Sequence, residues 1–287
     1  MVRGITRRTA LAGTGALILS PVRAAGPEAR FAALEQKADG RLGVAMLDTV
    51  SGRRIGYRAE ERFALCSTFK LLAGAQALSR VDRGEDRLDA PITVTRQDLV
   101  TYSPMTETRL GTGLTIAEAC DAAITLSDNT AANLLLDRQG GPAGLTAYLR
   151  SLGDAVTRLD RRETALNEAT PSDPRDTTTP GAMLEMLRRL ILGDVLTPAS
   201  RAQLATWLVA SKTGGRRLRA GLPEGWRIGD KTGTGSHGAT NDVAVAWPPG
   251  QGPLLIAAYF AESSAPAEQR EAVLAEVGRI AAELLGG

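Results

Sequence analysis

Hydrophobic residues near the start of the chain alternate with small or polar ones, which is the pattern of a β-strand. The alternate positions, on either side of the turn sequence Thr-Val-Ser-Gly, are Leu42, Val44, Met46, Ile55 and Tyr57. A spacing of two residues places such side chains on one face of each strand. We therefore predict two antiparallel strands within residues 41–58, joined as a hairpin.

The middle of the chain has helical spacing instead. Apolar residues recur there every three or four positions, and Gly, Pro, Asp or Asn residues divide the pattern into segments. The predicted helices cover residues 67–82, 115–126, 129–139, 142–152, 180–192 and 198–209. Pro180 and Pro198 stand at first turns, where proline is favoured, and Thr197 is placed to cap the last of these helices.

Strand patterns return near the C-terminus, over Trp226–Lys231, Asp242–Trp247 and Leu254–Ala261, and a helix is predicted over Ala267–Leu285. Strands at both ends of a chain, with helices between them, predict an α+β fold. We expect one antiparallel sheet built from the N- and C-terminal segments, with flanking helices and an inserted all-α domain.

The expected domain boundaries follow from this order. Residues 25–63 and 210–287 are expected to form the α/β sheet domain, and residues 64–209 the all-α domain, with the functional site in the cleft between them. Residues 158–179 form a charged segment without apolar periodicity, and a loop of this length is usually functional or disordered. Its Arg161 and Asp176 carry opposite charges that can pin the two ends together.

Residues 1–24 have the composition of a signal peptide. A basic start is followed by the apolar run Ala10–Leu19 and by a small-x-small pattern that ends at Ala24. The pair Arg7-Arg8 resembles a twin-arginine export signal, and an ordinary secretory signal is the alternative. We expect a periplasmic or secreted monomer without stable membrane association after cleavage, since no later segment has the roughly 20 apolar residues of a membrane span.

The charge balance changes when this segment is set aside. The whole chain has 34 basic and 32 acidic residues, for a net charge of +2, and four of the basic residues precede Glu28, the first acidic one. The remainder has 30 basic and 32 acidic residues, or −2. No basic patch is long enough to follow a phosphate backbone, so we expect no nucleic-acid partner.

Histidine and cysteine usage narrows the chemistry further. His237 is the single histidine, and no CxxC or HxxxH spacing occurs. These counts argue against a zinc hydrolase, and against a Ser-His-Asp triad unless His237 is its base. Cys66 and Cys120 both lie in apolar stretches, where unpaired thiols behave as small buried hydrophobes. We expect neither a metal nor a cofactor.

The first reactive pair is Ser67 and Lys70, which stand just before an apolar helix pattern. Residues three apart share a helix face, so the amine would lie beside the hydroxyl. A desolvated lysine can activate a serine, and the N–H groups at a helix start favour negative charge. The alternative is an N-cap serine with a solvated lysine one turn later.

The second motif, Ser127-Asp128-Asn129, lies between two predicted helices. In a turn, residues 127 and 129 can point the same way and offer a hydroxyl for proton relay and an amide for a carbonyl group. The simpler interpretation is that Ser127 or Asp128 caps the helix that begins near Asn129.

The third motif, Lys231-Thr232-Gly233-Thr234-Gly235, ends a predicted strand. A cation, two hydroxyls and two glycines that allow close backbone approach make a strand edge suited to an anion. The alternative is a plain strand that runs into a turn.

In this order, the three motifs resemble the signature of class A β-lactamases and penicillin-binding proteins. The resemblance covers about residues 28–285, and the order of strands and helices also agrees with the family fold. In the irregular loop, Glu163 and Asn167 resemble the Glu-x-x-x-Asn segment with which class A β-lactamases hold a hydrolytic water. Penicillin-binding proteins lack this fourth motif. The alternative for Glu163 is a solvated carboxylate beside Arg161 and Arg162.

The resemblance implies hydrolysis of the β-lactam amide bond of penicillins and cephalosporins through a serine acyl-enzyme, which confers resistance. Ser67 would attack the lactam carbonyl, and either Lys70 or Glu163, acting through water, would remove its proton. Ser127, assisted by Lys231, would protonate the departing lactam nitrogen. The backbone N–H groups of Ser67 and Thr234 would hold the oxyanion.

The remaining roles implied by the resemblance concern deacylation and substrate binding. Glu163 and Asn167 would hold the hydrolytic water, and Asn129 would bind the acyl-amide side chain. Tyr102 resembles the aromatic wall at the mouth of the cleft. The strand edge Thr232-Gly233-Thr234 would meet the substrate carboxylate.

Two departures from the family pattern concern arginine and cysteine. Many members have an arginine for the carboxylate where this chain has Thr240, and Arg217 resembles the alternative anchor. Cys66 before the nucleophile resembles members with broad cephalosporin or carbapenem activity, but their second cysteine corresponds to Gly235 here. The other family disulfide would pair Cys120 with the position of Gly74, so both cysteines are expected to be unpaired.

Two alternative functions remain open at this point. A D,D-peptidase would use the same three motifs on peptidoglycan stem peptides, and a non-enzymatic β-lactam sensor would acylate and stop. Glu163 and Asn167 disfavour both alternatives because they supply a route for deacylation. His237 is expected to be a surface turn residue and not a catalyst.

Overall fold

The computed structural model describes Met1 and residues 26–285. The predicted export signal, beyond Met1, lies outside the described residues. Among the described helices, none combines the length and the apolar composition that crossing a membrane requires.

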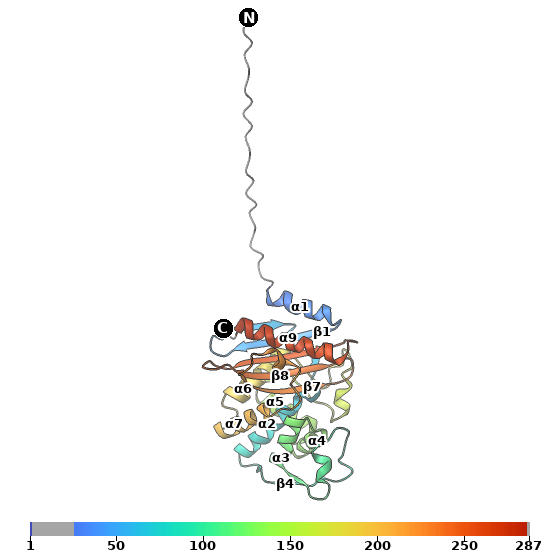
Figure 1. The fold of residues 1–287 in the computed structure, drawn as a ribbon. Coiled ribbons are helices and arrows are strands. Elements are labelled where there is room, and N and C mark those ends of the chain that lie inside the picture. Colours follow the sequence, from blue (N-terminus) through green and yellow to red (C-terminus); the bar gives the residue numbers. More distant parts are fainter. Residues whose placement is uncertain (2–25, 286–287) are drawn as a thin grey trace.

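A five-stranded antiparallel sheet joins the two ends of the chain (Figure 1). Its strands, in the spatial order β2-β1-β9-β8-β7, are β2 Arg54–Tyr57, β1 Arg41–Asp48, β9 Leu254–Ala261, β8 Thr240–Trp247 and β7 Arg227–Thr234. The N-terminal strand β1 pairs along its whole length with β9, from Arg41 opposite Ala261 to Asp48 opposite Leu254. The site strand β7 is an edge strand of this sheet.

Helices cover both faces of the sheet. On one face pack α1 (Pro27–Lys37), the short α8 (Leu218–Gly221) and α9 (Ala267–Leu285), whose apolar residues form one core with alternate residues of β1. Leu42, Val44 and Met46 point into this core, as the period of two predicts. Figure 1 shows α1 and α9 above the sheet and the other long helices below it.

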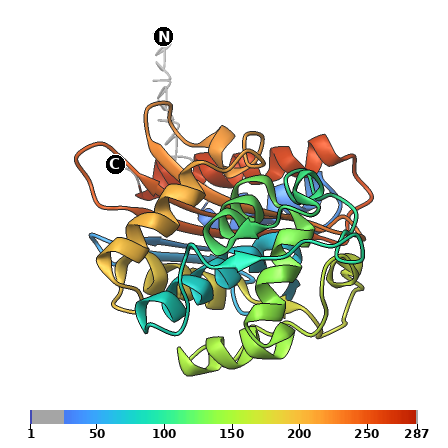
Figure 2. The ribbon, with the colours of Figure 1, turned by 90° about the horizontal axis from the view of Figure 1, so that it is seen from below.

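The opposite face carries the helical middle of the chain, which Figure 2 shows from below. Its helices are α2 Phe69–Asp82, α3 Ile116–Asp121, a π-helix Ala122–Leu126, α4 Asn129–Arg138, α5 Gly141–Ser151, α6 Pro180–Leu192 and α7 Pro198–Val209. Short strand pairs join β3 (Phe63–Ala64) to β6 (Thr177–Thr178) and β4 (Pro91–Ile92) to β5 (Leu114–Thr115). Three 3₁₀ helices cover Cys66–Thr68, Thr106–Arg109 and Ala165–Glu168. The fold is therefore α+β, with the helical part inserted between strands of one sheet.

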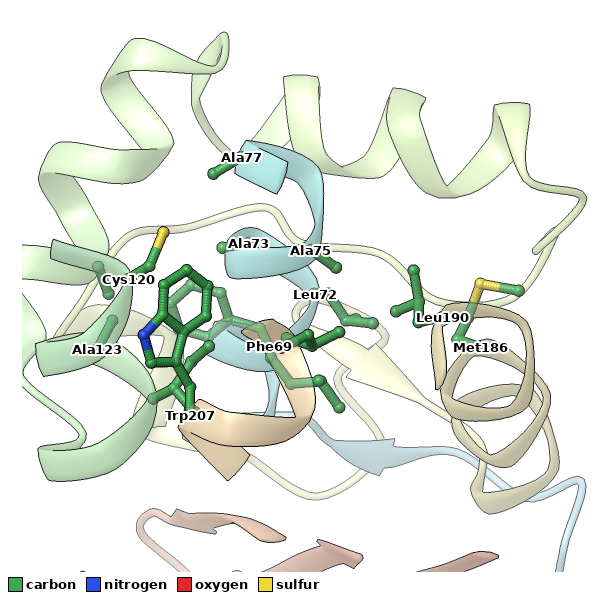
Figure 3. Packing of buried hydrophobic residues seen from close by; sticks show 14 of the residues in the cluster. Phe69, Leu72, Ala73, Ala75, Ala77, Cys120, Ala123, Met186, Leu190 and Trp207 are labelled. Atoms are coloured by element: carbon green, nitrogen blue, oxygen red, sulfur yellow. The ribbon is translucent and has the colours of Figure 1, made fainter. Parts of the chain in front are cut away.

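Helix α2 lies at the centre of the helical core. Every residue from Phe69 to Ser79 is buried, because helices from several directions surround it. Figure 3 shows Leu72 of α2 close to Leu190 of α6, with Trp207 of α7 beside Phe69. The helix that follows the nucleophile candidate is thus fixed by packing on all sides.

Several of the predicted element boundaries are confirmed. Helices α6, α7 and α9 and strand β9 have the predicted limits, and Thr197 caps α7 by accepting a hydrogen bond from the Ser200 N–H. The predicted strand that ends at Lys231 runs on to Thr234, since its pairing with β8 continues to Thr240. The sequence interpretation did not include α1 or α8.

Truncation of a core side chain of α2 should destabilise the fold strongly. Leu72 is fully buried, so Leu72→Ala removes packed methyl groups and leaves a cavity. We expect a loss of about 2–5 kcal/mol in the free energy of unfolding, measured by urea denaturation. The matched control is Leu192→Ala, because Leu192 is 41% exposed and its truncation should cost under about 1 kcal/mol. Equal losses in the two variants would contradict this assignment of the core.

Candidate active site

Ser67 lies at the turn where the polypeptide passes from the sheet into α2. It is the middle residue of the 3₁₀ helix Cys66–Thr68, and it is buried. The turn is held by a hydrogen bond from the Leu65 N–H to the Asp176 carbonyl (2.8 Å) and by one from the Thr68 hydroxyl to the Leu65 carbonyl (2.7 Å). Packing of α2 then fixes the hydroxyl of Ser67 in place.

The ammonium group of Lys70 is the centre of the site. Its side chain is fully buried, and Nζ donates to Ser67 Oγ (3.0 Å), the Ser127 carbonyl (2.8 Å) and Asn129 Oδ1 (2.5 Å). Nζ also lies 2.9 Å from Oε1 of Glu163, whose side chain is equally buried. Burial lowers the pKa of Lys70, while the Glu163 carboxylate acts in the opposite direction.

The Ser127-Asp128-Asn129 turn has both of the roles considered for it. Asp128 caps α4 by accepting from the Ala131 N–H (2.8 Å), and it also accepts from the Thr106 N–H (2.9 Å). Ser127 ends the π-helix with a φ of 60°, in the left-handed region. This reversal aims the oxygens of residues 127 and 129 at Lys70. The cap therefore holds the turn while its neighbours line the site.

A second buried cation, Lys231, approaches Ser127 from the sheet side. Its Nζ donates to Ser127 Oγ (3.0 Å) and to the Thr232 carbonyl (2.9 Å). The pKa of Lys231 is lowered to about 7, mainly by burial and secondly by the nearby charge of Lys70. The Ser127 hydroxyl thus lies between two lysines.

The irregular loop brings Glu163 to the nucleophile candidate. Oε1 of Glu163 accepts from Ser67 Oγ (3.1 Å), and Oε2 accepts from the side-chain amide of Asn167. Asn133 holds the backbone of Glu163 from α4, since its Nδ2 donates to the Glu163 carbonyl (2.9 Å) and its Oδ1 accepts from the Glu163 N–H (2.9 Å). The sequence interpretation missed Asn133. Its signal was an amide within the apolar run Ala131–Leu136 of that helix.

The predicted pin across this loop is present. Asp176 is fully buried and accepts from Arg161 Nε (2.6 Å), and its Oδ1 accepts from the Asp160 N–H (2.7 Å) and the Arg161 N–H (2.8 Å). These bonds join the two ends of the loop, which leaves the segment around Glu163 to face Ser67.

The side chain of Arg217 contacts the end of β7. Its guanidinium donates to the carbonyls of Gly233 and Asn241 (2.8 Å each) and to the Thr234 hydroxyl (2.7 Å). Thr240, which occupies the position discussed above for arginine, accepts a hydrogen bond from Arg270 (3.1 Å). The Arg217 charge therefore lies next to the strand edge that the sequence predicted to bind an anion.

These side chains line a cleft of about 280 Å³. Its lining residues are Ser67, Tyr102, Ser127, Asn129, Asn167, Thr213, Arg217, Thr232, Gly233 and Thr234. Tyr102 stands at the mouth with 57% of its surface exposed. All twelve predicted site residues thus lie in this cleft or, like Lys70, Glu163 and Lys231, make hydrogen bonds to residues that line it.

The cysteines and the histidine lie where the sequence predicted. Cys66 and Cys120 are buried free thiols, and burial raises the pKa of Cys66 to about 12. His237 is exposed in the turn after β7 and has a φ of 51°. Within the described residues, no group of three or more His, Cys, Asp or Glu side chains is arranged to hold a metal ion.

Known proteins share this sequence and this fold over most of their length. Residues 26–285 match the family model described as the "Beta-lactamase enzyme family". The chain is 53% identical over 251 residues to β-lactamase FAR-1 of Nocardia farcinica, covering 88% of this chain and 80% of the relative. It is 51% identical over 257 residues to β-lactamase L2 of Stenotrophomonas maltophilia, covering 89% and 85%.

A solved structure also shows similarity to a β-lactamase. An ancestral class A β-lactamase superposes with a TM-score of 0.88 at 63% sequence identity, over 89% of this chain and 98% of that one.

Proposed function

The chain belongs to the class A β-lactamase family and hydrolyses β-lactams, the activity behind resistance to these antibiotics; we propose that it acts on penicillins and cephalosporins through an acyl-enzyme on Ser67. The observation that carries this proposal is the buried ammonium of Lys70, which contacts Ser67, Ser127, Asn129 and Glu163 together. This cluster joins a nucleophile, two candidate bases and a proton relay within hydrogen-bond distance.

Acylation begins with attack of Ser67 Oγ on the lactam carbonyl. Lys70 Nζ lies 3.0 Å and Glu163 Oε1 3.1 Å from this oxygen, so each is within reach of its proton. Desolvation of Lys70 favours its neutral form, which is the form that can act as a base. Ser127 then gives its proton to the departing nitrogen, and Lys231 stabilises the hydroxyl oxygen that loses it.

The oxyanion pocket depends on the close approach of β7 to the Ser67 turn. A Cβ atom on Gly233 would lie 2.9 Å from the Leu65 carbonyl and 3.2 Å from Cys66 Cβ, so a larger residue would push the strand away. With glycine there, the N–H groups of Ser67 and Thr234 can face the same oxygen. We assign the developing negative charge to these two donors.

Deacylation uses the loop side of the cleft. Glu163, held by Asn133 through its backbone and by Asn167 through its carboxylate, is the proposed base for a water that attacks the acyl-serine ester. The water oxygen bonds to the acyl carbon as its proton passes to Glu163. The bond from that carbon to Ser67 Oγ then breaks, and Glu163 returns the proton to Ser67 Oγ.

Substrate binding is assigned to the strand edge and the mouth of the cleft. The hydroxyls of Thr232 and Thr234, together with Lys231 and Arg217, form the proposed site for the substrate carboxylate. Asn129 binds the acyl-amide group. Tyr102 provides a wall at the mouth, next to Asn129, whose N–H donates to the Tyr102 carbonyl (3.0 Å).

We also propose the organisation and cellular position of the protein. The sheet part comprises residues 25–63 and 210–287, and the all-α part residues 64–209, including the loop at 158–179. Residues 1–24 act as a cleaved export signal, after which a monomer works in the periplasm or outside the cell without stable membrane association.

Removal of Glu163 should separate the two halves of the reaction. Glu163→Ala should still be acylated by a penicillin, because Lys70 remains next to Ser67, but turnover should fall by a factor of about 100 or more. Intact-mass spectrometry should show the chain plus one drug molecule accumulating. Ser67→Ala is the control and should show no adduct. An adduct-free Glu163→Ala protein that binds substrate would contradict the deacylation role.

The charge of Lys231 predicts an alkaline limit on activity. Below pH 7 this group is a cation that attracts the substrate carboxylate, and it loses its proton as the pH rises through about 7. Therefore kcat/KM for benzylpenicillin, which reports the free enzyme, should decline above about pH 7. The decline in kcat, which reports the enzyme–substrate complex, should occur at a higher pH, because the bound substrate carboxylate stabilises the protonated form of Lys231.

The test for this limit is a charge-conserving variant. Arginine stays protonated throughout this range, so Lys231→Arg should move the decline in kcat/KM upward by more than one pH unit or abolish it, whatever its absolute rate. A decline at the same pH in both proteins would assign it to another group.

Arg217 should contribute to binding of the substrate carboxylate. Arg217→Ala removes a buried guanidinium beside Thr234, and KM for benzylpenicillin should rise about tenfold. The adjacent Arg216 is the matched control. Both arginines pair with Glu271, Arg216 at 2.8 Å and Arg217 at 3.5 Å. The Arg216 side chain is largely exposed, so Arg216→Ala should leave KM within about twofold of the wild type. An unchanged KM in Arg217→Ala would exclude Arg217 from the carboxylate site.

A further inference from the structure

The turn between β7 and β8 makes two hydrogen bonds to the loop that carries Glu163. The Ser236 N–H donates to the Asn167 carbonyl (2.9 Å), and His237 Nδ1 lies 3.1 Å from the Glu168 carbonyl. Asn167 is the residue whose amide contacts the Glu163 carboxylate. These two contacts therefore join the sheet directly to the deacylation end of the loop.

The turn is itself firmly attached to the sheet. The His237 carbonyl accepts from the Glu262 N–H at the end of β9 (2.7 Å), and the Gly235 N–H donates to the Ala239 carbonyl (3.0 Å). Gly238 packs so closely that a Cβ atom there would lie 2.3 Å from the Ser263 carbonyl. The imidazole of His237 thus projects from a rigid base.

On the loop side, the backbone carbonyl of Glu168 has no hydrogen-bond donor within its own helix. Glu168 is the last residue of the 3₁₀ helix Ala165–Glu168, and the final carbonyls of a helix accept no N–H donor from within that helix. The next residue, Ala169, turns into the left-handed region with a φ of 49°, so the helix cannot continue. The Glu168 side chain pairs with Arg161, while the backbone carbonyl of Glu168 accepts from the imidazole of His237.

We propose that His237 is a positioning residue for deacylation. It holds the Glu168 carbonyl, and through the adjoining Asn167 it keeps the Glu163 carboxylate aligned with the water that hydrolyses the acyl-enzyme. His237 does not line the cleft and touches no reacting atom, so its action is through the loop alone. This inference rests on the function proposed above for Glu163 and Asn167.

The chemistry of the contact specifies which replacements preserve it. A carbonyl accepts only if Nδ1 carries the proton, which is true of the Nδ1–H tautomer and of the imidazolium ion. The side-chain amide nitrogen of asparagine occupies nearly the place of Nδ1 and also donates. In glutamine that nitrogen stands one bond farther out. Asparagine also tolerates a positive φ, such as the 51° of His237.

The experiment compares the wild type with His237→Ala, His237→Gly, His237→Asn and His237→Gln. Acylation and deacylation rates are measured separately with a slow cephalosporin, by stopped-flow absorbance and time-resolved mass spectrometry of the Ser67 adduct. The Ala, Gly and Gln variants should deacylate roughly fivefold more slowly, with a smaller change in acylation, and the Asn variant should deacylate within about twofold of the wild type. The glycine variant removes the imidazole while accepting the positive φ, so it separates the contact from backbone strain.

Hydrogen exchange gives a readout of the contact itself. Peptides that cover residues 160–170 should exchange faster in the Ala, Gly and Gln variants than in the wild type and the Asn variant, while peptides from α2 stay unchanged. Wild-type deacylation by the glycine variant would overturn the proposal, as would equal slowing of both steps or a failure of asparagine to restore deacylation. The proposed function is judged separately, by whether the wild type forms and then hydrolyses its Ser67 adduct.

Discussion

The buried pair of Lys70 and Glu163 is the interaction on which the site depends. Two fully buried charges 2.9 Å apart must each be desolvated, and loss of one partner from such a pair typically costs about 3–5 kcal/mol because the other is left unpaired. The surrounding polar groups reduce the cost of desolvating the two charges. Ser67, Ser127 and Asn129 give the ammonium further oxygens, and Asn167 gives the carboxylate a donor. A set of groups assembled to stabilise two buried charges is also the set that moves protons.

Three parts of the fold have to meet for this pair to form. Packing around α2 fixes Lys70, and the cap of α4 by Asp128 fixes the turn beside it. The loop that carries Glu163 anchors Leu159 and Leu166 in the helical core, and polar contacts hold the rest of it. Asp176 joins its ends, and Asn133 and the β7–β8 turn attach its active segment. The catalytic carboxylate is therefore held largely by polar contacts. We therefore expect changes that displace this loop to slow deacylation while acylation, which depends on the packed helix α2, is less affected.

Local signals in the sequence account for much of the fold and for the principal site residues. Proline at first turns and threonine caps define α6 and α7, and the alternation in β1 correctly groups Leu42, Val44 and Met46 on one face. Helix α1 was missed because only Phe31 in it is buried, so its apolar period is weak. The clamp by Asn133 and the contact of His237 with Glu168 could not be predicted, because each joins residues about 30 or 70 positions apart through geometry that no local pattern contains.

The arrangement of the two lysines explains why a nearly neutral protein can favour an anionic substrate. Lys231 lies 3.0 Å and Lys70 3.4 Å from the same Ser127 hydroxyl, and the charge of Lys70 disfavours protonation of Lys231. Glu163 compensates Lys70, but in the free site Lys231 has the Ser127 hydroxyl and the Thr232 carbonyl as its acceptors. A substrate carboxylate at the β7 edge adds negative charge to that of Asp230 and so stabilises the cation further when the substrate is bound. Anion binding and proton relay through Ser127 are thus coupled by one lysine, and a neutral analogue would lose both benefits together.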